Sequence, residues 1–207
     1  MEKIDIDLGG TDSEHTAFLA NGMYDPRVAL GGLQPRGFDE FMKTYTTFTV
    51  LSSSLSMNVM YEGYTAPTLE SSTTGEMLKA IRQSTTSEDA AASPVVCGIH
   101  KGLAVMTAGA AEVQMEKDRT LWRVISPVSD AITMSSKLAV SDFYGKGKLV
   151  GATGYTGTDS ADPTEKVYWD VWFARASGHT QGKCKLKAYV TIQYNCIFTE
   201  PRTLGAS

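Results

Sequence analysis

Cysteine is scarce in this 207-residue sequence, and that scarcity limits both its redox chemistry and its metal chemistry. Cys97, Cys184 and Cys196 are an odd set, and no two of them have the C-x-x-C spacing of zinc or redox sites. No N-x-S/T sequon indicates secretion. Because free cysteine behaves as a small apolar residue, we predict three buried thiols in a reducing compartment, with a single disulfide as the alternative.

Long apolar runs and a basic excess are also lacking. No stretch reaches the ~18 consecutive apolar residues that a membrane span needs. The first seven residues lack the basic start and the apolar run of a signal peptide. Nineteen Lys and Arg against 23 Asp and Glu give a formal charge of -4. We therefore expect no membrane insertion, and any binding of nucleic acid must depend on a local cluster of charge.

Residues for catalysis are equally sparse. The three histidines, His15, His100 and His179, are scattered, so no metal site of several histidines and a carboxylate is expected. Cys97 and His100 could ligate one ion together only if their strand bends between them. The sequence has no G-x-S-x-G elbow and no recognisable set of acid, base and nucleophile. We name no catalytic, cofactor-binding or metal-ligating residue, and we predict that the protein is not an enzyme.

Alternation with a period of two is the strongest pattern that is present. Apolar residues occupy every second position in 185–198, in 167–173 and along 46–61, where we expect a bulge near 52–54. Weaker alternating runs cover 15–19, 95–99, 121–125 and 132–140. This pattern predicts about eight β-strands, many with one face in a core and the other facing solvent or a partner.

Long connections separate these strands, since Gly, Pro, Ser, Thr and Asp accumulate in 21–36, 62–74 and 145–163. Helical patterns are limited to 35–42 and 75–84. The sequence therefore predicts an all-β protein: a single eight-stranded antiparallel jelly-roll sandwich with long inter-strand loops and one or two short helices. We assign all of 1–207 to this one domain, with an acidic, solvated and mobile terminal segment at 1–14. Jelly rolls include capsids, lectins and cupins, so the fold alone does not select a function.

Positive charge is concentrated at one place, where Lys183, Lys185 and Lys187 share one face of a strand opposite the core. Two interpretations stay open from these residues alone. The lysines protect a solvated or edge strand against aggregation, or they contact phosphate groups.

Several short motifs follow one another in an order that resembles the capsid proteins of circovirus-like viruses, the circular Rep-encoding single-stranded DNA viruses. Each motif is weak by itself, and the specificity lies in their order along nearly the whole chain. The motifs are Asn-Gly-Met-Tyr-Asp-Pro at 21–26, Gly-Gly-Leu-Gln-Pro-Arg-Gly-Phe-Asp at 31–39, Tyr45, Met-Ser-Ser-Lys at 134–137, Asp-Pro-Thr-Glu-Lys-Val-Tyr-Trp at 162–169 and Phe-Thr-Glu-Pro at 198–201.

The resemblance implies a viral capsid structural protein that self-assembles, as about sixty copies, into a small icosahedral shell around a circular single-stranded DNA genome. It implies a place in the virion, with assembly in the host-cell nucleus, and outer loops that meet a host-cell receptor. On this reading Tyr64, Tyr155, Thr156 and Trp172 are candidates for subunit interfaces or exterior loops.

The resembled capsids usually begin with an Arg-rich arm that holds the genome, whereas the first 26 residues here contain one Lys and no Arg. Contact with nucleic acid is then expected from other cations along the chain. The candidates are Lys137, Arg175, Lys183, Lys185 and Lys187.

The alternative function is a jelly-roll carbohydrate- or receptor-binding module, a lectin-like attachment domain. Exposed aromatic rings among Trp122, Trp172 and Tyr155 would stack on sugar rings in such a module. The position of Trp172 discriminates between the two hypotheses. In a capsid subunit we expect it to face a neighbouring subunit, and in a binding module we expect it to line an open concave groove.

Overall fold

The computed structural model describes residues 2–9, 13–29, 34–65, 94–126, 129–176 and 183–202, without the side chains of 9, 63–65 and 183. Strands dominate this part of the chain. The strands are β1 (Glu2–Gly9), β2 (Ser13–Leu19), β3 (Tyr45–Thr65), β4 (Val95–Gly102), β5 (Thr120–Ile125), β6 (Ile132–Ala139), β7 (Gly157–Thr158), β8 (Tyr168–Arg175) and β9 (Lys183–Pro201). The helices are α1 (Phe38–Thr44), α3 (Ala111–Met115) and α4 (Ser141–Tyr144).

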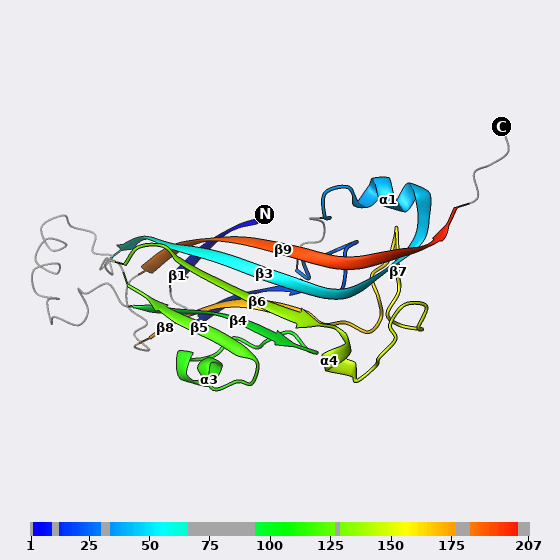
Figure 1. The fold of residues 1–207 in the computed structure, drawn as a ribbon. Helices are drawn as coiled ribbons and strands as arrows, with labels where there is room; N and C mark the ends of the chain where they lie inside the picture. Colours follow the sequence, from blue (N-terminus) through cyan, green and yellow to red (C-terminus); the bar gives the residue numbers. More distant parts are fainter. Residues whose placement is uncertain are drawn as a thin grey trace, which may run out of the picture.

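Two antiparallel sheets face each other (Figure 1). The upper sheet has the order β1-β9-β3-β6, with the short β7 also on β3, and the lower sheet has the order β2-β8-β4-β5. Except for β4 and β5, neighbours within each sheet are not consecutive strands of the chain, and the first strand pairs with the last. This order confirms the predicted fold. It is a jelly roll.

The core lies between the sheets and is formed by the alternate residues of their strands. Ile4, Ile6 and Leu8 of β1 are buried, as are the inward residues of β3, β8 and β9. Trp169 of β8 is fully buried in this core, and its indole N–H donates to the Oγ of Ser53 on β3 over 3.0 Å. A polar atom in the core is thus satisfied across the two sheets.

A second, smaller core forms where α1 packs on one end of the long β3–β9 pair (Figure 1). Gly37 enters the helix with φ 84°, a conformation that favours glycine. Phe38 of α1 then packs edge-on against Phe48, with ring centroids 5.5 Å apart. The register of β3 shifts between Val50 and Ser52, just before the predicted bulge, so that both ends of β3 turn their apolar side chains inward.

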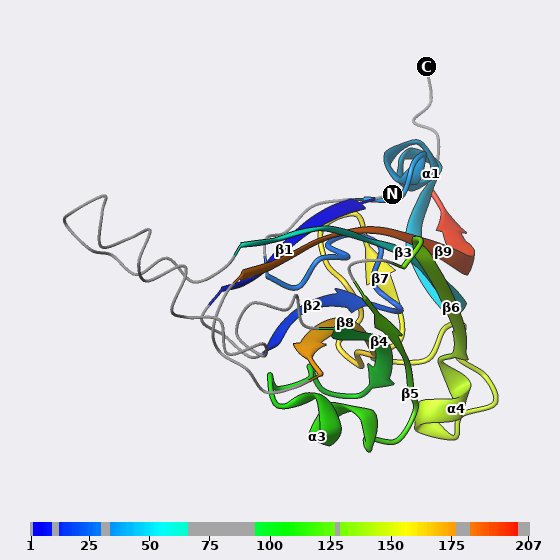
Figure 2. The ribbon, with the colours of Figure 1, turned by 90° about the vertical axis from the view of Figure 1, so that its left-hand side faces the viewer.

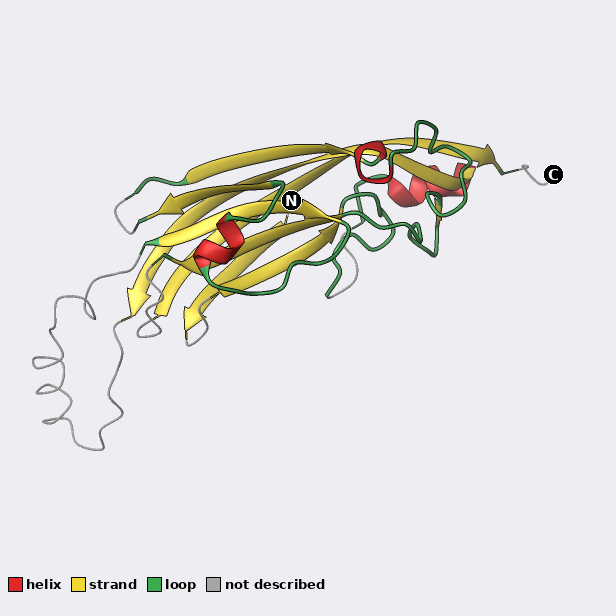
Figure 3. Ribbon diagram, turned by 90° about the horizontal axis from the view of Figure 1, so that it is seen from below, coloured by secondary structure: helices red, strands yellow, loops and turns green. Residues whose placement is uncertain are grey.

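The structure differs from the sequence prediction at the start of the chain, where the acidic segment 1–14 contains β1. The signal was present, because Ile4, Ile6 and Leu8 alternate with charged residues. Helices α3 and α4 were not predicted, and α3 with its flanking loop lies on the outer face of the lower sheet (Figures 2 and 3). The predicted helix at 75–84 lies outside the described residues. Within those residues, no helix has the length and apolarity needed to cross a bilayer.

Candidate subunit and nucleic-acid interfaces

Two of the sequence motifs meet in space where β2 ends and the approach to β8 begins. The carboxylate of Asp162 accepts hydrogen bonds from the backbone N–H groups of Tyr24 and Asp25, both over 3.0 Å. Burial raises the pKa of Asp162, and these two bonds lower it in part. A Cβ at Gly22 would lie 2.6 Å from an Asp162 oxygen, so the close approach requires glycine.

Asn21 completes this junction from the same motif. Its side-chain amide donates to the carbonyl of Glu165 over 2.7 Å, and its amide oxygen accepts from the backbone N–H of Val167 over 2.9 Å. Asn21 is almost fully buried, so these bonds satisfy a polar group that would otherwise be costly to bury. The junction therefore joins segments about 140 residues apart in sequence.

The motifs around Tyr45 and 198–201 also meet. Tyr45 pairs with Pro201 in the β3–β9 register, and Phe41 of α1 stacks on Phe198 with ring centroids 4.8 Å apart. Phe198 belongs to the same apolar cluster as Tyr24 of the junction. Four of the motif segments thus gather at the α1 end of the molecule.

The predicted lysine face lies on the outer side of the upper sheet, because the residues between the lysines point into the core. The register with β1 places Lys185 opposite Asp7 and Lys187 opposite Asp5. Each described lysine of this strand therefore has a carboxylate as its cross-strand neighbour, an arrangement that stabilises the sheet and offsets the charge.

Further pairs extend this charge pattern. The ammonium group of Lys187 contacts the carboxylate of Glu62 on β3, and this hydrogen bond raises the pKa of Lys187. Lys3 pairs with Asp5 over 2.9 Å. The side chain of Lys183 lies outside the described residues. Among the rest, carboxylates match the ammonium groups in number on this half of the face, so it is not the concentrated positive patch that the sequence indicated.

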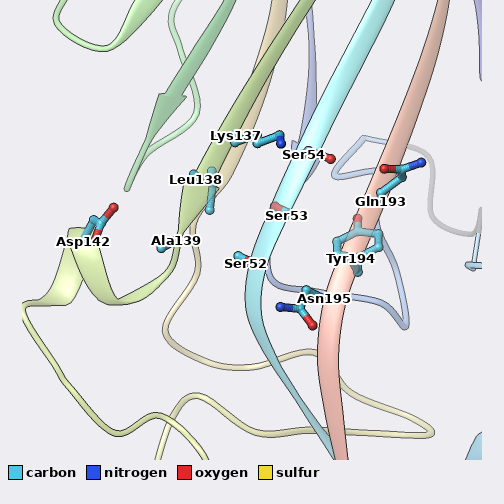
Figure 4. Close-up of a pocket in the computed structure, with 10 residues that line it drawn as sticks. All are labelled: Ser52, Ser53, Ser54, Lys137, Leu138, Ala139, Asp142, Gln193, Tyr194 and Asn195. Atoms are coloured by element: carbon cyan, nitrogen blue, oxygen red, sulfur yellow. The ribbon is translucent and has the colours of Figure 1, made fainter.

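An open polar groove of about 560 Å³ runs along the other half of the upper sheet's outer face, between β3, β6 and β9 (Figure 4). Most of the residues that line it carry a hydroxyl or an amide group. Its polar residues include Ser52, Ser54, Lys137, Asp142, Gln193 and Asn195. Such a surface offers many hydrogen-bond donors and acceptors to a polar ligand.

Lys137 is the candidate cation that the structure places in this groove. It lies on β6 opposite Ser54 of β3, and its side chain extends toward Ser54 (Figure 4). Its backbone carbonyl accepts a hydrogen bond from the ammonium of Lys101 over 2.7 Å. Lys137 is exposed, and none of the ion pairs within the described ranges includes it. An exposed ammonium among hydroxyls can contact a phosphate.

Arg175 is buried, so its position does not suit contact with nucleic acid. It lies at the end of β8 and is 2 % exposed, and its guanidinium donates to the backbone carbonyl of Leu8 on β1. This bond links the two sheets. The sequence prediction for Arg175 is corrected on this ground, since a buried side chain is not available to an external ligand.

Trp172 is also buried, in contrast to the prediction of an interface or groove residue. It is 1 % exposed and packs with Val96, Met106 and Ala111 beneath the α3 segment. A Cβ at Gly98 on the neighbouring strand would lie 2.4 Å from the indole ring, so Gly98 provides the space for it. Trp172 therefore holds the α3 segment on the lower sheet, and it faces neither a neighbouring subunit nor an open groove.

The remaining predicted surface residues are only partly accessible. Tyr155 is 8 % exposed and packs edge-on against Tyr144 with centroids 5.1 Å apart, which corrects its prediction as an exterior residue. Thr156 is half-buried, with its hydroxyl 3.5 Å from that of Thr49. The side chain of Tyr64 lies outside the described residues.

β5 forms where the weaker alternating run at 121–125 predicted a strand, but its apolar residues are exposed, which the sequence did not indicate. Leu121, Trp122 and Val124 of β5 are 41 %, 41 % and 48 % exposed, while Ile125 is buried. Only one of these four residues thus enters the core of this predicted half-buried strand. The available signal was the weakness of the alternation, because large apolar residues occupy both odd and even positions.

Titratable groups gather on the outer face of the lower sheet. His100 of β4 is the cross-strand neighbour of Asp170 on β8, and its Nδ1 lies 2.9 Å from the hydroxyl of Thr120. Burial raises the pKa of Asp170 to about 6, and burial together with nearby Lys117 lowers the pKa values of His15 and His100. Asp170 is completely buried, so a substrate cannot reach it for acid–base catalysis.

Cys97 and His100 do not converge as metal ligands. They point to opposite faces of β4, since Cys97 is buried in the core and its thiol approaches the carbonyl of Arg123 over 3.5 Å. In the described ranges, no three side chains among His, Cys, Asp and Glu lie close enough to hold a metal ion.

Comparisons with known proteins give similarity at the level of structure. No known protein family and no curated protein matches the sequence. A structure of desmodium yellow mottle tymovirus is similar over 99 % of this chain and 89 % of that chain, with 12 % identity and a TM-score of 0.38. The empty head of turnip yellow mosaic virus is similar over 100 % and 84 %, with 9 % identity and a TM-score of 0.36. The strand order establishes the fold independently of these two structures.

Proposed function

We propose that this chain is the subunit of a viral capsid and that its activity is self-association. A jelly roll alone does not select this function. The observation that carries the proposal is the junction between the motif segments, in which Asn21, Gly22 and Asp162 interlock. Two of the motifs that resemble circovirus-like capsids, at 21–26 and 162–169, thus bond to each other within the jelly roll.

In its finer form the proposal is a small icosahedral shell of about sixty copies around a circular single-stranded DNA genome. Such a shell needs heterologous contacts around its fivefold and threefold axes and isologous contacts at its twofold axes. The subunit has no catalytic role in this proposal, and its place is the virion. The long connections between strands are candidates for the outer surface that meets a receptor.

Contact with the genome is proposed at the groove of Lys137 rather than at the lysines of β9. Lys185 and Lys187 face carboxylates, which reduces the attraction that they exert on phosphate. Lys137 is exposed beside hydroxyl and amide groups that can hydrogen-bond to sugar and phosphate. Nucleic-acid binding in this form is independent of base sequence and weakens with salt.

The alternative of a sugar-binding module loses two of its three aromatic candidates. Trp172 and Tyr155 are buried, which leaves Trp122 as the exposed ring among them. Recognition of sugars by stacking commonly needs a ring beside convergent polar groups. Trp122 shares its face of β5 with the exposed Val124 instead, and apolar side chains of this kind suit contact with protein.

The test is the native mass of the protein in solution at neutral pH and moderate salt, measured by light scattering with the ultraviolet absorbance ratio recorded for nucleic acid. We expect a uniform particle of roughly 1.3 MDa, which is about sixty copies of the 22.3 kDa chain. A monomer that persists across salt and pH would contradict the proposal. Binding to a glycan array by such a monomer would support the alternative.

A further inference from the structure

The edge of β5 lacks the protection that the other border strands of the described sheets have. β1 carries Lys3, Asp5 and Asp7 on its outer face. The free side of β2 is occupied, because Leu19 donates to the carbonyl of Pro26 over 2.7 Å in the connection that follows the strand. Charged residues and covering segments prevent border strands from pairing with other chains.

β6 is protected as well, since it bears Lys137, whose carbonyl accepts a hydrogen bond from Lys101. β5 is the border of the lower sheet, next to β4, and in the described residues no strand pairs with its other side (Figure 2). Its central residues 121–124 are all exposed, three of them large and apolar. An exposed apolar border strand is a template for strand addition.

Exposed apolar side chains are concentrated in the stretch of sequence that contains β5. Six of the ten exposed large apolar side chains in the described chain lie between residues 103 and 124. They are Leu103, Val105, Val113, Leu121, Trp122 and Val124. Within this stretch, Leu121, Trp122 and Val124 lie together on β5, and exposed apolar side chains that lie together mark a surface that another protein covers.

We propose that β5 pairs antiparallel with β5 of a second copy across a twofold axis, so that two lower sheets become one continuous sheet. The inference rests on the proposed self-association and gives it a specific contact. A strand that pairs with itself forms an isologous contact, the type that a closed shell needs at its twofold axes.

The charge of Arg123 limits the possible registers of this pairing. Residues that face each other in an antiparallel pair point to the same side of the sheet, so a twofold axis must be centred on one residue. A centre at Arg123 would place two guanidinium groups opposite each other, which is unfavourable. A centre at Trp122 pairs the two indole rings and places Arg123 of one copy opposite Leu121 of the other, with no like charges in contact.

A pair of strands of this length forms only a small interface. Such an interface is sufficient when the subunit is part of a shell. Each subunit is held by several neighbours at once, so contacts that are weak individually combine into a stable assembly. The pairing also removes the exposed backbone groups of β5 from water, with hydrogen bonds in place of solvent.

The register is tested by a cysteine substitution at its centre. Directly opposed residues have Cα atoms about 4.5 to 5.5 Å apart, within the roughly 4.4 to 6.8 Å range of disulfides. We therefore expect Trp122→Cys to form a disulfide-linked dimer on air oxidation, seen on a non-reducing gel. Val28→Cys is the matched control, because Val28 is 45 % exposed in the connection after β2, at the opposite border of the lower sheet. This control and the wild-type chain should stay uncross-linked.

A second variant tests whether the contact is needed. Trp122→Lys places two ammonium groups opposite each other at the axis, and we expect it to reduce particle formation at least tenfold at equal concentration. Val28→Lys should assemble as the wild type does. Circular dichroism checks that both variants keep the strand content of the folded chain.

The outcomes separate the inference from the proposed function. A Trp122→Cys cross-link together with loss of particles by Trp122→Lys supports the β5 contact. Wild-type particles, without the cross-link and with normal assembly of Trp122→Lys, overturn the β5 contact and leave the capsid proposal standing. A wild-type chain that stays monomeric overturns the capsid proposal, and the β5 contact with it.

Discussion

Gly98 is a residue whose missing side chain allows a large neighbour to pack. A Cβ there would lie 2.4 Å from the indole of Trp172, which in turn holds the α3 segment. We expect Gly98→Ala to lower the free energy of unfolding by about 1 to 3 kcal/mol, because an overpacked site forces its neighbours to move. Urea unfolding followed by tryptophan fluorescence measures the change.

The matched control for this variant is Gly147→Ala. A Cβ at Gly147 meets nothing within 4 Å. This substitution should change the free energy of unfolding by less than about 0.5 kcal/mol. If the two alanine variants are equally stable, the close packing of Trp172 on Gly98 does not constrain the fold.

Asp170 gives the stability of the chain a dependence on pH. Burial raises its pKa from 3.8 to about 6, so the folded chain holds a proton there that the unfolded chain has released. The stability associated with Asp170 is present below about pH 4 and is lost as pH rises through about 6, a difference of about 3 kcal/mol. His15 and His100 act in the opposite direction, since their lowered pKa values reduce stability as pH falls.

Asp170→Asn isolates the first of these effects. We expect the difference in unfolding free energy between this variant and the wild type to grow in favour of Asn as pH rises from 4 to 7, because only Asp170 can ionise. Urea titrations at several pH values measure it. A difference that is flat with pH for Asp170→Asn would contradict the burial argument.

At the scale of elements, the sequence predicted the strands best where one face is buried and the other is polar. In β9 the core residues Leu186, Ala188 and Val190 occupy the alternate positions that the pattern indicated. In β5 the alternation is weak, and the strand lies at the border of its sheet, where one edge has no neighbouring strand among the described residues. Exposure of that strand depends on strand order, which periodicity does not encode.

Candidate site residues were harder to predict because their environment comes from segments far away in sequence. Trp172 is covered by residues near α3, a stretch without periodic pattern. Lys187 is paired with Glu62, 125 positions earlier in the chain. The sequence correctly indicated that the lysines face outward, and it gave no information about their partners across the sheet.

The contribution of the motif junction to the stability of the fold can be measured. Asp162→Ala leaves the backbone N–H groups of Tyr24 and Asp25 without their acceptor. We expect a loss of about 2 kcal/mol in unfolding free energy, since each unsatisfied partly buried group is costly. Hydrogen exchange of these two N–H groups should also become faster.

Asp159→Ala is the control for the junction. Asp159 is about half exposed and forms an ion pair with Arg202, an arrangement that contributes at most about 1 kcal/mol. Equal losses in the two variants would show that the Asp162 bonds have no special weight.

For the whole molecule, the distribution of charge predicts where nucleic acid would touch the shell. Under the capsid proposal, Lys137→Gln should lower the nucleic-acid content of purified particles, because one exposed ammonium per subunit is lost. Lys187→Gln should have a smaller effect, since Glu62 already offsets that charge. The ultraviolet absorbance ratio of particles of equal size gives the comparison. An effect of Lys187→Gln equal to or larger than that of Lys137→Gln would contradict the assignment of the groove.

The pairing of β1 with β9 has a consequence for the synthesis of the protein. β9 lies between β1 and β3 in the upper sheet, so this sheet cannot close until the ribosome has released residues near 201. Contacts between residues so distant in sequence form slowly. A nascent or prematurely terminated chain would lack the strand that joins β1 to β3 and could not present a finished surface to other copies. In this topology, only full translation through β9 yields a subunit that is ready to assemble.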